Sequence, residues 1–325
     1  MKKWFVSIVV LFVFLSGASQ IQAASYNSYV VIDAENGRTL MGVNEHARLP
    51  IASLTKIWTA LVVLENSELT DEVVVSKEAS LVEGSSIYLM ENETYTIDYL
   101  LHGLMMQSGN DAATALAEHV GGSVEGFVQL MNEKAELYQL NETTFTNPTG
   151  LHNEAHLSSA YDTAKMLQIA MMNPQFRKIA STQNFSDGRQ WRNKHRLMHE
   201  KIGAIAGKTG YTKVAGRTLA TYFEREQKSF VVVTINEGND WNIHRNLADF
   251  IDNNFEKQTI VKKGKYNANG LAIELDEPFQ MLLHKKERPN FEHIVKVSRL
   301  KGSDRGVWLL YADEALVSSK LVTVK

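Results

Sequence analysis

The sequence predicts an α+β domain built around one sheet, followed by a small all-β domain. Strand-like segments stand at both ends of a helical middle region that extends to about residue 256. After Lys257 the helical spacing of apolar residues disappears, and short β runs separated by turns take its place. A chain of 325 residues is comfortable for two domains, and its 44% hydrophobic residues are enough to bury a full core.

The first 24 residues predict a secretory signal peptide. A short positive region is followed by an apolar stretch from Trp4 to Leu15 and by small residues up to Ala24, where cleavage is expected. An uncleaved anchor is the alternative, although the apolar stretch is short for a membrane span. The predicted division is a signal peptide at 1–24, the α+β domain at 25–256 and the small β domain at 257–325.

The α+β domain is predicted to begin with a hairpin. Tyr29 to Asp33 and Arg38 to Met41 are strand-like and flank an Asn-Gly turn. The segment from Ile57 to Glu65 is apolar on nearly every side, which predicts a buried helix with Ser53 at its N-terminus. Lys56 then lies on the same face as Ser53, one turn later.

This first motif, Ser53-Leu54-Thr55-Lys56, supplies a nucleophile and its base. A serine hydroxyl needs a base within hydrogen-bond reach, and burial lowers the pKa of a lysine, so a neutral Lys56 could accept the proton of Ser53. The free backbone N–H of Ser53 would face a developing oxyanion. An N-cap serine followed by a surface lysine fits the same four residues and remains the alternative.

A second motif, Ser108-Gly109-Asn110, stands in the break between two apolar helical segments. From that loop Ser108 could pass a proton between a leaving amine and the first motif. Asn110 could donate to a substrate carbonyl and accept from the lysine of the first motif. A helix linker in which Asp111 caps the next helix is compatible with these roles.

The third motif, Lys208-Thr209-Gly210, lies in a segment from Ile202 to Thr212 that predicts a strand. Its glycines let a substrate backbone lie close to the strand edge. Lys208 and Thr209 suit a carboxylate, and the backbone N–H of Tyr211 would complete an oxyanion hole with that of the nucleophile. An ordinary edge strand blunted by lysine is the alternative.

The remaining elements are predicted from the same periodicities. They are helices at Ser123–Tyr138 and Ser159–Met171, strands at Thr218–Phe223 and Phe230–Ile235, and a closing helix at His244–Phe255. The small domain has β runs at Leu271–Leu275, Phe279–Leu283, His293–Leu300, Trp308–Ala312 and Leu321–Val324. The methionine pairs Met105-Met106 and Met171-Met172 are expected to fill the core.

The three motifs in this order resemble the D-alanyl-D-alanine carboxypeptidases of peptidase family S11, the low-molecular-mass penicillin-binding proteins. The resemblance covers about residues 26 to 256. It extends to the longer boxes Pro50–Lys56, Leu104–Ala112 and Lys208–Thr212 with Ala215-Gly216, and to the intervening segments Asn147–Leu151 and Ser158–Asp162.

The resemblance implies a β-lactamase/transpeptidase-like catalytic fold and a serine hydrolase of cell-wall (peptidoglycan) biosynthesis. By this likeness Ser53 attacks the penultimate D-alanine carbonyl of a peptidoglycan stem peptide, Lys56 takes its proton, and Ser108 serves the departing D-alanine. The terminal carboxylate and the substrate backbone are held by Asn110, Lys208, Thr209, Gly210 and Tyr211. β-Lactams are implied as inhibitors that acylate the serine, and no metal or cofactor is implied.

Three features depart from the family pattern. Asn193-Lys194-His195 has a histidine where the family has a second asparagine, and Ile205-Ala206-Gly207 lacks the usual aspartate. The arginine that many members place after the next strand is not clearly matched, since Asn239-Asp240-Trp241 occupies that stretch and Arg245 comes later. Substrate-carboxylate binding is therefore less firmly assigned than the nucleophile.

Two other function classes remain open. A serine β-lactamase shares the motif layout, but the usual class A enzyme has an aspartate where Gly109 stands, together with a glutamate loop that is not obvious in this chain. A non-catalytic module that binds β-lactams or the wall is the other class, and the intact Ser53 and Lys56 argue against it.

The composition argues against nucleic-acid binding, disulfides and thiolate metal sites. The net charge of −3 offers no electrostatic case for nucleic acid, and the absence of cysteine removes disulfides and thiolate metal sites. His152 and His156 have helical i, i+4 spacing, but they follow a turn-forming stretch and do not predict a metal site. We expect export to the wall space or medium, with any membrane tether supplied by the leader, since Leu321–Lys325 is strand-like rather than an amphipathic helix.

Overall fold

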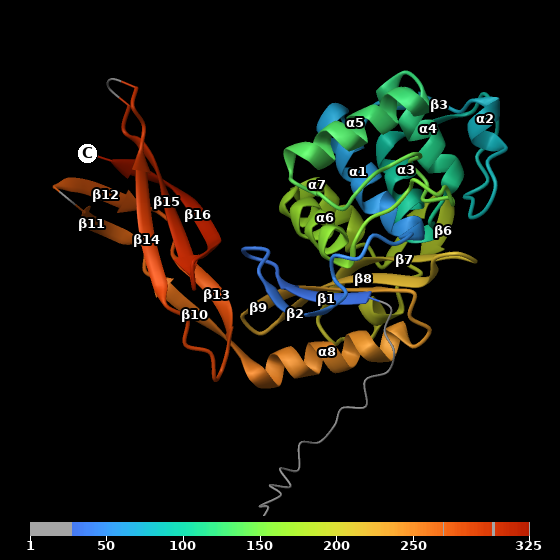
Figure 1. Cartoon of the computed structure of the whole chain (residues 1–325). Helices are drawn as coiled ribbons and strands as arrows, with labels where there is room; N and C mark the ends of the chain where they lie inside the picture. Colours follow the sequence, from blue (N-terminus) through green and yellow to red (C-terminus); the bar gives the residue numbers. More distant parts are fainter. Residues whose placement is uncertain (1–27, 269, 301–302, 325) are drawn as a thin grey trace, which may run out of the picture.

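The computed structural model describes residues 28–268, 270–300 and 303–324 (Figure 1), so the predicted signal peptide lies outside the described residues. The α+β prediction is confirmed. One antiparallel sheet has the strand order β2-β1-β9-β8-β7. Its strands are β1 (Ser28–Asp33), β2 (Thr39–Val43), β7 (Ala204–Thr212), β8 (Gly216–Arg225) and β9 (Lys228–Ile235). The third motif therefore lies on β7, an edge strand of this sheet.

The helical region covers one face of the sheet, as Figure 1 shows. Its α-helices are α1 (Thr55–Asn66), α2 (Lys77–Ser80), α3 (Ile97–His102), α4 (Asn110–Gly121), α5 (Val124–Leu137), α6 (Ala160–Met172) and α7 (Pro174–Ala180). Shorter elements are the 3-10 turns η1 (Ala52–Leu54) and η3 (Arg196–His199), the π-helix η2 (Gly103–Gln107), and the small hairpins β3 (Glu72–Val74) with β4 (Thr94–Thr96) and β5 (Asn184–Asp187) with β6 (Arg189–Arg192). The opposite face carries α8 (Asp240–Asn254).

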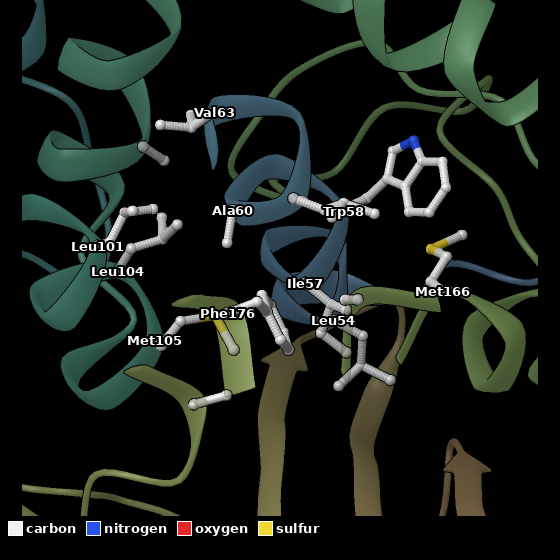
Figure 2. Close-up of a cluster of buried hydrophobic side chains, with 14 of the residues drawn as sticks. Leu54, Ile57, Trp58, Ala60, Val63, Leu101, Leu104, Met105, Met166 and Phe176 are labelled. Carbon is white, nitrogen blue, oxygen red and sulfur yellow. The ribbon is translucent and has the colours of Figure 1, made fainter. Parts of the chain in front are cut away.

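Helix α1 lies at the centre of the main core, and its neighbours surround it on every side (Figure 2). All residues from Thr55 to Leu64 are buried. This explains why the sequence is apolar all round, since a helix with no polar face cannot lie on a surface. The indole N–H of Trp58 donates to the carbonyl of Met131 at 3.0 Å, so the one polar group of that side chain is satisfied.

Phe176 packs into this core beside α1 and is fully buried (Figure 2). Replacing it with alanine should lower the free energy of unfolding by about 3–5 kcal/mol, because a large buried side chain leaves a cavity that relaxes only in part. Met172→Ala is the matched control on the preceding helix, since Met172 is 77% exposed. Its effect should stay within about 0.5 kcal/mol. Denaturant unfolding measures both, and similar values for the two variants would contradict this core assignment.

The exposure of Met172 corrects the expectation that both methionine pairs fill the core. Met105, Met106 and Met171 are buried, but Met172 ends α6 and points outward. The first motif also differs slightly from its prediction. Ser53 sits in the 3-10 turn η1 rather than in the α-helix itself, which begins at Thr55.

The C-terminal β domain has two sheets, β10 with β13 and β11-β12-β16-β15-β14. The strands are β10 (Phe255–Val261), β11 (Gly264–Ala268), β12 (Leu271–Leu275), β13 (Phe279–His284), β14 (Phe291–Val297), β15 (Arg305–Ala312) and β16 (Ala315–Val324). They enclose a separate core that includes Phe279, Trp308 and Leu310. The sequence did not predict β10 and β11, because polar and charged residues interrupt both segments. β10 begins at Phe255, which is close to the predicted domain boundary at residue 257. We keep that boundary as a proposal.

The hairpin of β1 and β2 holds the β domain against the sheet. The buried carboxylate of Asp33 accepts the backbone N–H of Leu282 at 2.8 Å, and Arg38 donates to the carbonyl of the same residue at 3.0 Å. Lys257 pairs with Glu35 at 2.9 Å. Within the described part of the chain, no helix is long and apolar enough to cross a bilayer.

Candidate active site

The three motifs meet at one open cleft of about 360 Å³ between the helical region and the edge of the sheet. The first motif contributes Ser53 and the second contributes Asn110. Strand β7, which carries the third motif, contributes Tyr211 and Thr212. The remaining walls are Gly84, Ser85, Thr149, Gly150 and Leu151. Residues separated by more than 150 positions in the chain therefore share one hollow, as the motif order predicts.

Ser53 lines the cleft, and Lys56 lies fully buried beside it. The Nζ of Lys56 lies 3.1 Å from the Oγ of Ser53, 2.6 Å from the Oδ1 of Asn110 and 2.7 Å from the carbonyl oxygen of Thr149. Burial, and secondarily the nearby charge of Lys208, holds the pKa of Lys56 well below its ordinary value. The site therefore favours the neutral form of the amine more than water does.

A neutral amine has two N–H groups and one lone pair. Asn110 Oδ1 and the Thr149 carbonyl are pure acceptors, so they take both N–H groups and leave the lone pair for the hydroxyl of Ser53. The amide of Asn110 is fixed in this orientation because its Nδ2 donates to the carbonyl of Glu83 at 2.6 Å. The network thus orients Lys56 as a proton acceptor.

Thr149 is a functional residue to which the sequence assigned no role, because it acts through its backbone carbonyl. The preceding Asn147 fixes the turn, accepting from the backbone N–H of Gly150 at 2.8 Å and from the hydroxyl of Thr149 at 2.9 Å. Gly150 has φ +79°, and a Cβ there would overlap the carbonyl oxygen of Ala52. The Asn-Pro-Thr-Gly segment is the sequence signal that could have identified this acceptor.

Ser108 follows the π-helix η2 in a left-handed conformation, with φ 65° and ψ 32°. Such conformations are costly for residues other than glycine and are concentrated at functional sites. The adjoining Asp111 holds the loop, as its buried carboxylate accepts from the backbone N–H groups of Ile87 and Leu89. The expectation that Asp111 caps the next helix is wrong, because α4 begins at Asn110 with Gly109 at the N-cap, and the bond from the Ala112 N–H to Asp111, at 2.9 Å, lies within the first turn.

Ser108 makes its hydrogen bond to the third motif. The Nζ of Lys208 donates to the Oγ of Ser108 at 3.0 Å and to the carbonyl of Thr209 at 2.9 Å. Lys208 is almost completely buried, and this burial, followed by the nearby charge of Lys194, lowers its pKa to about 7. Lys208 is therefore a cation only on the acid side of neutrality in the free site.

This lowered pKa makes substrate binding sensitive to pH. If Lys208 holds a carboxylate, the KM of a peptide acid should rise as the pH increases through about 7, because the cationic form is then lost. The matched peptide amide carries no carboxylate, so its KM should change much less. Steady-state kinetics from about pH 6 to about pH 9 test this, and equal pH dependence for the acid and the amide would contradict it.

Gly210 allows β7 to approach the nucleophile closely. A Cβ at this position would lie 3.0 Å from the backbone nitrogen of Ser53. The next residue, Tyr211, lines the cleft. This part of β7 therefore lies close to the backbone of Ser53.

The structure shows the surroundings of two residues from the segments that depart from the family pattern, His195 and Arg245. His195 is buried, with Nε2 2.9 Å from the Oγ1 of Thr221, and burial lowers its pKa to about 4. Its imidazole is thus neutral and packs behind Gly207, where a Cβ would lie 2.6 Å from Nε2. Arg245 is held by Glu200 through two hydrogen bonds of 2.7 and 2.6 Å.

His156, one of the two histidines with i, i+4 spacing, braces the first motif. Its Nε2 lies 2.8 Å from the Oγ1 of Thr55, and its Nδ1 accepts the backbone N–H of Thr146 at 3.1 Å. Burial lowers the pKa of His156 to about 4. Among the described residues, no group of three or more histidine, aspartate or glutamate side chains is arranged to hold a metal ion.

Comparison with known proteins agrees with this arrangement. The family described as D-alanyl-D-alanine carboxypeptidase, Peptidase S11, matches residues 15–239. The chain is 30% identical to the D-alanyl-D-alanine carboxypeptidase DacF of Bacillus subtilis, with 92% of this chain and 84% of that protein covered. It is 28% identical to a D-alanyl-D-alanine endopeptidase of Haemophilus influenzae, over 76% of this chain and 84% of that protein.

Two solved structures extend the likeness to both domains. Penicillin-binding protein 5 of Haemophilus influenzae superimposes with a TM-score of 0.77 at 25% identity and covers 92% of this chain and 96% of its own. Penicillin-binding protein 6B of Escherichia coli gives a TM-score of 0.71 at 26% identity, over 91% of this chain and 94% of its own. The α+β transpeptidase fold with a C-terminal β half-barrel, predicted in outline from the sequence, is thereby confirmed. The chain belongs to peptidase family S11, the D-alanyl-D-alanine carboxypeptidase family of the penicillin-binding protein 5 type.

Proposed function

We propose that the protein is a serine-type D-Ala-D-Ala carboxypeptidase that removes the terminal D-alanine from peptidoglycan stem peptides. The observation that carries this proposal is the environment of Lys56, whose two N–H groups are taken by Asn110 and Thr149. The remaining lone pair faces the hydroxyl of Ser53 at 3.1 Å. A buried amine oriented in this way is a general base for the attack of a serine.

In the acylation step, the Oγ of Ser53 bonds to the carbonyl carbon of the penultimate D-alanine while Lys56 takes the hydroxyl proton. The backbone N–H groups of Ser53 and Tyr211 stabilise the oxyanion of the tetrahedral intermediate. The close approach of β7 at Gly210 supports this pairing of donors. Lys208 and Thr209 hold the terminal carboxylate of the substrate.

The departing nitrogen needs a proton before the C–N bond breaks. Ser108 can supply it, because its oxygen accepts from Lys208 and its own O–H is free to point at the nitrogen. The proton that Lys56 took from Ser53 then passes to Ser108, which restores the Ser108 hydroxyl and the neutral Lys56 amine. Water then attacks the acyl-enzyme with Lys56 as base, which returns Ser53 to its starting state and releases the shortened peptide.

β-Lactams should acylate Ser53 in the same pose, because the strained amide resembles the D-Ala-D-Ala end. The described cleft lining contains no aspartate or glutamate. A fast β-lactamase of the usual class A type activates its deacylating water with a glutamate. This composition therefore favours a peptidase that β-lactams inhibit over a β-lactamase that turns them over.

A paired assay tests the proposal. Release of D-alanine from diacetyl-L-Lys-D-Ala-D-Ala is measured beside hydrolysis of a chromogenic β-lactam by the same enzyme sample. We expect repeated turnover of the peptide, together with a stoichiometric, slowly reversed reaction of the β-lactam. Rapid β-lactam turnover without D-alanine release would instead identify a β-lactamase. Stable acylation without D-alanine release would identify a sensing or binding module.

We also propose that the enzyme acts outside the cytoplasmic membrane, where stem peptides are found. The charged, apolar and small-residue order of positions 1–24 supports export. N-terminal sequencing of the exported protein should find Ser25 at or near the start. An intact Met1 would show instead that the leader is retained and serves as an anchor.

A further inference from the structure

A concentration of positive charge lies beside the catalytic strand. Residues 28–256 contain 19 Lys and Arg against 29 Asp and Glu, a net charge of −10. Within that range, residues 188–223 contain eight Lys and Arg and a single acidic residue, Glu200. An acidic domain with one strongly cationic segment has a local field that attracts anions to that segment.

Part of this segment forms an open hollow of about 520 Å³. Its lining is Arg192, Asn193, Lys194, Arg196, His199 and Glu200. The carboxylate of Glu200 is neutralised by Arg245 through two hydrogen bonds. Within the described chain, neither Arg192 nor Arg196 forms an ion pair, although the charge of Arg196 acts on Glu200, and both side chains are exposed. The hollow therefore presents guanidinium groups with unused donors.

Arg196 is held in place without losing its charge. Its guanidinium lies over the ring of Trp241, 5.7 Å from the centroid, and that of Arg217 lies at 5.8 Å from the same ring. Arg217 is paired with the buried Asp240, whereas Arg196 has no such pairing in the described residues. Stacking on an aromatic face leaves the edge donors of a guanidinium available for a ligand.

The hollow adjoins the catalytic groups directly. Lys194 donates to the carbonyl of Gln107 at 2.7 Å, and the side chain of Gln107 donates to the carbonyl of Arg192 at 2.9 Å. Gln107 immediately precedes Ser108. On the other side His195 packs against Gly207, which immediately precedes Lys208. Ser108 and Lys208 are thus each one residue along the chain from a neighbour of the segment that lines the hollow.

In the substrate orientation of the proposed mechanism, the leaving group lies on the side of the Ser108–Lys208 pair. This step rests on the proposed function, in which the oxyanion lies at Tyr211 and the terminal carboxylate at Thr209 and Lys208. Movement along β7 in the same direction leads to Gly207 and from there to the hollow. A leaving group of one D-alanine ends at Lys208, whereas a larger leaving group extends as far as the guanidinium groups of Arg192 and Arg196.

We propose that the hollow of Arg192, Lys194 and Arg196 binds a second carboxylate, on leaving groups larger than D-alanine. The ligand class is a D-amino acid whose side chain carries an acid several bonds from its own α-carboxylate. The chemistry is unchanged: the amide C–N bond breaks, the acyl group passes to Ser53 and then to water, and the departing amine receives the proton. Arginine suits this role because its fork binds a carboxylate through two hydrogen bonds.

The test compares two substrates that share the acyl half diacetyl-L-Lys-D-Ala. One has D-2-aminopimelic acid as its leaving group, and the other has the side-chain amide of the same residue. Both keep the α-carboxylate, so they differ only in the second charge. In the wild-type enzyme we expect kcat/KM for the acid to exceed that for the amide by about ten- to a hundredfold, as for a charge-assisted contact.

Arg192→Gln and Arg196→Gln should each reduce this ratio toward one. The ratio cancels any general loss of activity, because both substrates require the same acylation step. Lys178→Gln is the matched control, since it removes one exposed charge from α7, outside the hollow, and should leave the ratio unchanged. Added salt should lower the wild-type ratio, because exposed charges are screened.

The outcomes separate this inference from the proposed function. Cleavage of the D-Ala-D-Ala peptide with an acid-to-amide ratio near one overturns the inference alone. A high ratio that survives in both arginine variants overturns it as well. If penicillin acylates the enzyme but neither the D-Ala-D-Ala peptide nor the aminopimelate peptides are cleaved, the proposed function fails, and the inference fails with it.

Discussion

Replacement of Ser53 with alanine is expected to reduce D-alanine release by about four to six orders of magnitude, as loss of a serine nucleophile does in other acyl-transfer enzymes. Among the described residues that line the cleft, Ser53 is the hydroxyl that has an amine beside it at the start of a buried helix, whereas Thr55, beside His156, is fully buried and does not line the cleft. Ser108 is the nearest alternative, but its oxygen accepts a hydrogen bond from Lys208 at 3.0 Å.

Ser80→Ala provides the control for this variant, because Ser80 lies at the end of α2, where its hydroxyl donates to the carbonyl of Lys77. Its activity should equal that of the wild type. Release of D-alanine is followed by an enzyme-coupled assay, with thermal unfolding of each variant as a check on folding. Activity of Ser53→Ala within tenfold of the wild type, on a folded protein, would remove Ser53 from the mechanism.

Replacement of Lys56 with arginine is expected to slow acylation by about two to four orders of magnitude. Arginine keeps a positive charge and similar length, but it has no lone pair at neutral pH and cannot accept the serine proton. Lys165→Arg is the matched control, because Lys165 also donates to a backbone carbonyl, that of Tyr138 at 3.2 Å, away from the cleft. Stopped-flow acylation by a chromogenic β-lactam measures both variants.

The pH dependence of the wild-type enzyme adds an independent test of the base. The pKa of Lys56 lies well below its ordinary value, because the amine is buried, so the neutral form persists to a lower pH than it does for an exposed lysine. The acylation rate should therefore reach its plateau below the pH at which an exposed lysine titrates. A rate that keeps rising to about pH 10, or near-normal acylation by Lys56→Arg, would show that Lys56 acts as a cation.

The sequence predicted those site residues whose role depends on the chemistry of the side chain. Ser53 and Lys56 are three residues apart, so helical geometry alone brings them together. The contact between Asn110 and Lys56 was also expected, because an amide is one of few groups that can orient an amine. Residues of these kinds can be recognised before the fold is known.

Contacts that depend on the backbone could not be predicted in the same way. The Thr149 carbonyl completes the environment of Lys56, but every residue has a carbonyl, and its direction depends on the Asn147 turn. The Ser108–Lys208 hydrogen bond joins residues 100 positions apart, and it requires the sheet to be assembled first. His195 is similar, since its partner Thr221 lies on the next strand.

The fold shows the same division. Helix α1 was predictable because all-round apolarity has only one stable location, inside a core. β10 and β11 were missed because their alternation is interrupted by lysine, glutamine and asparagine, and pairing with β13 and β12, respectively, supplies the stability that their own sequence lacks. Met172 was assigned to the core from residue type alone, but its position at the last turn of α6 exposes it.

The most direct test of the central claim, that Ser53 is the nucleophile, is the location of the penicilloyl group. The enzyme is incubated with benzylpenicillin, digested and mapped by mass spectrometry. The mass increase of one penicillin should lie on the peptide that contains Ser53, and it should be absent from the Ser53→Ala variant. A penicilloyl group on the peptide that contains Ser108, or an adduct of undiminished yield in Ser53→Ala, would contradict the mechanism.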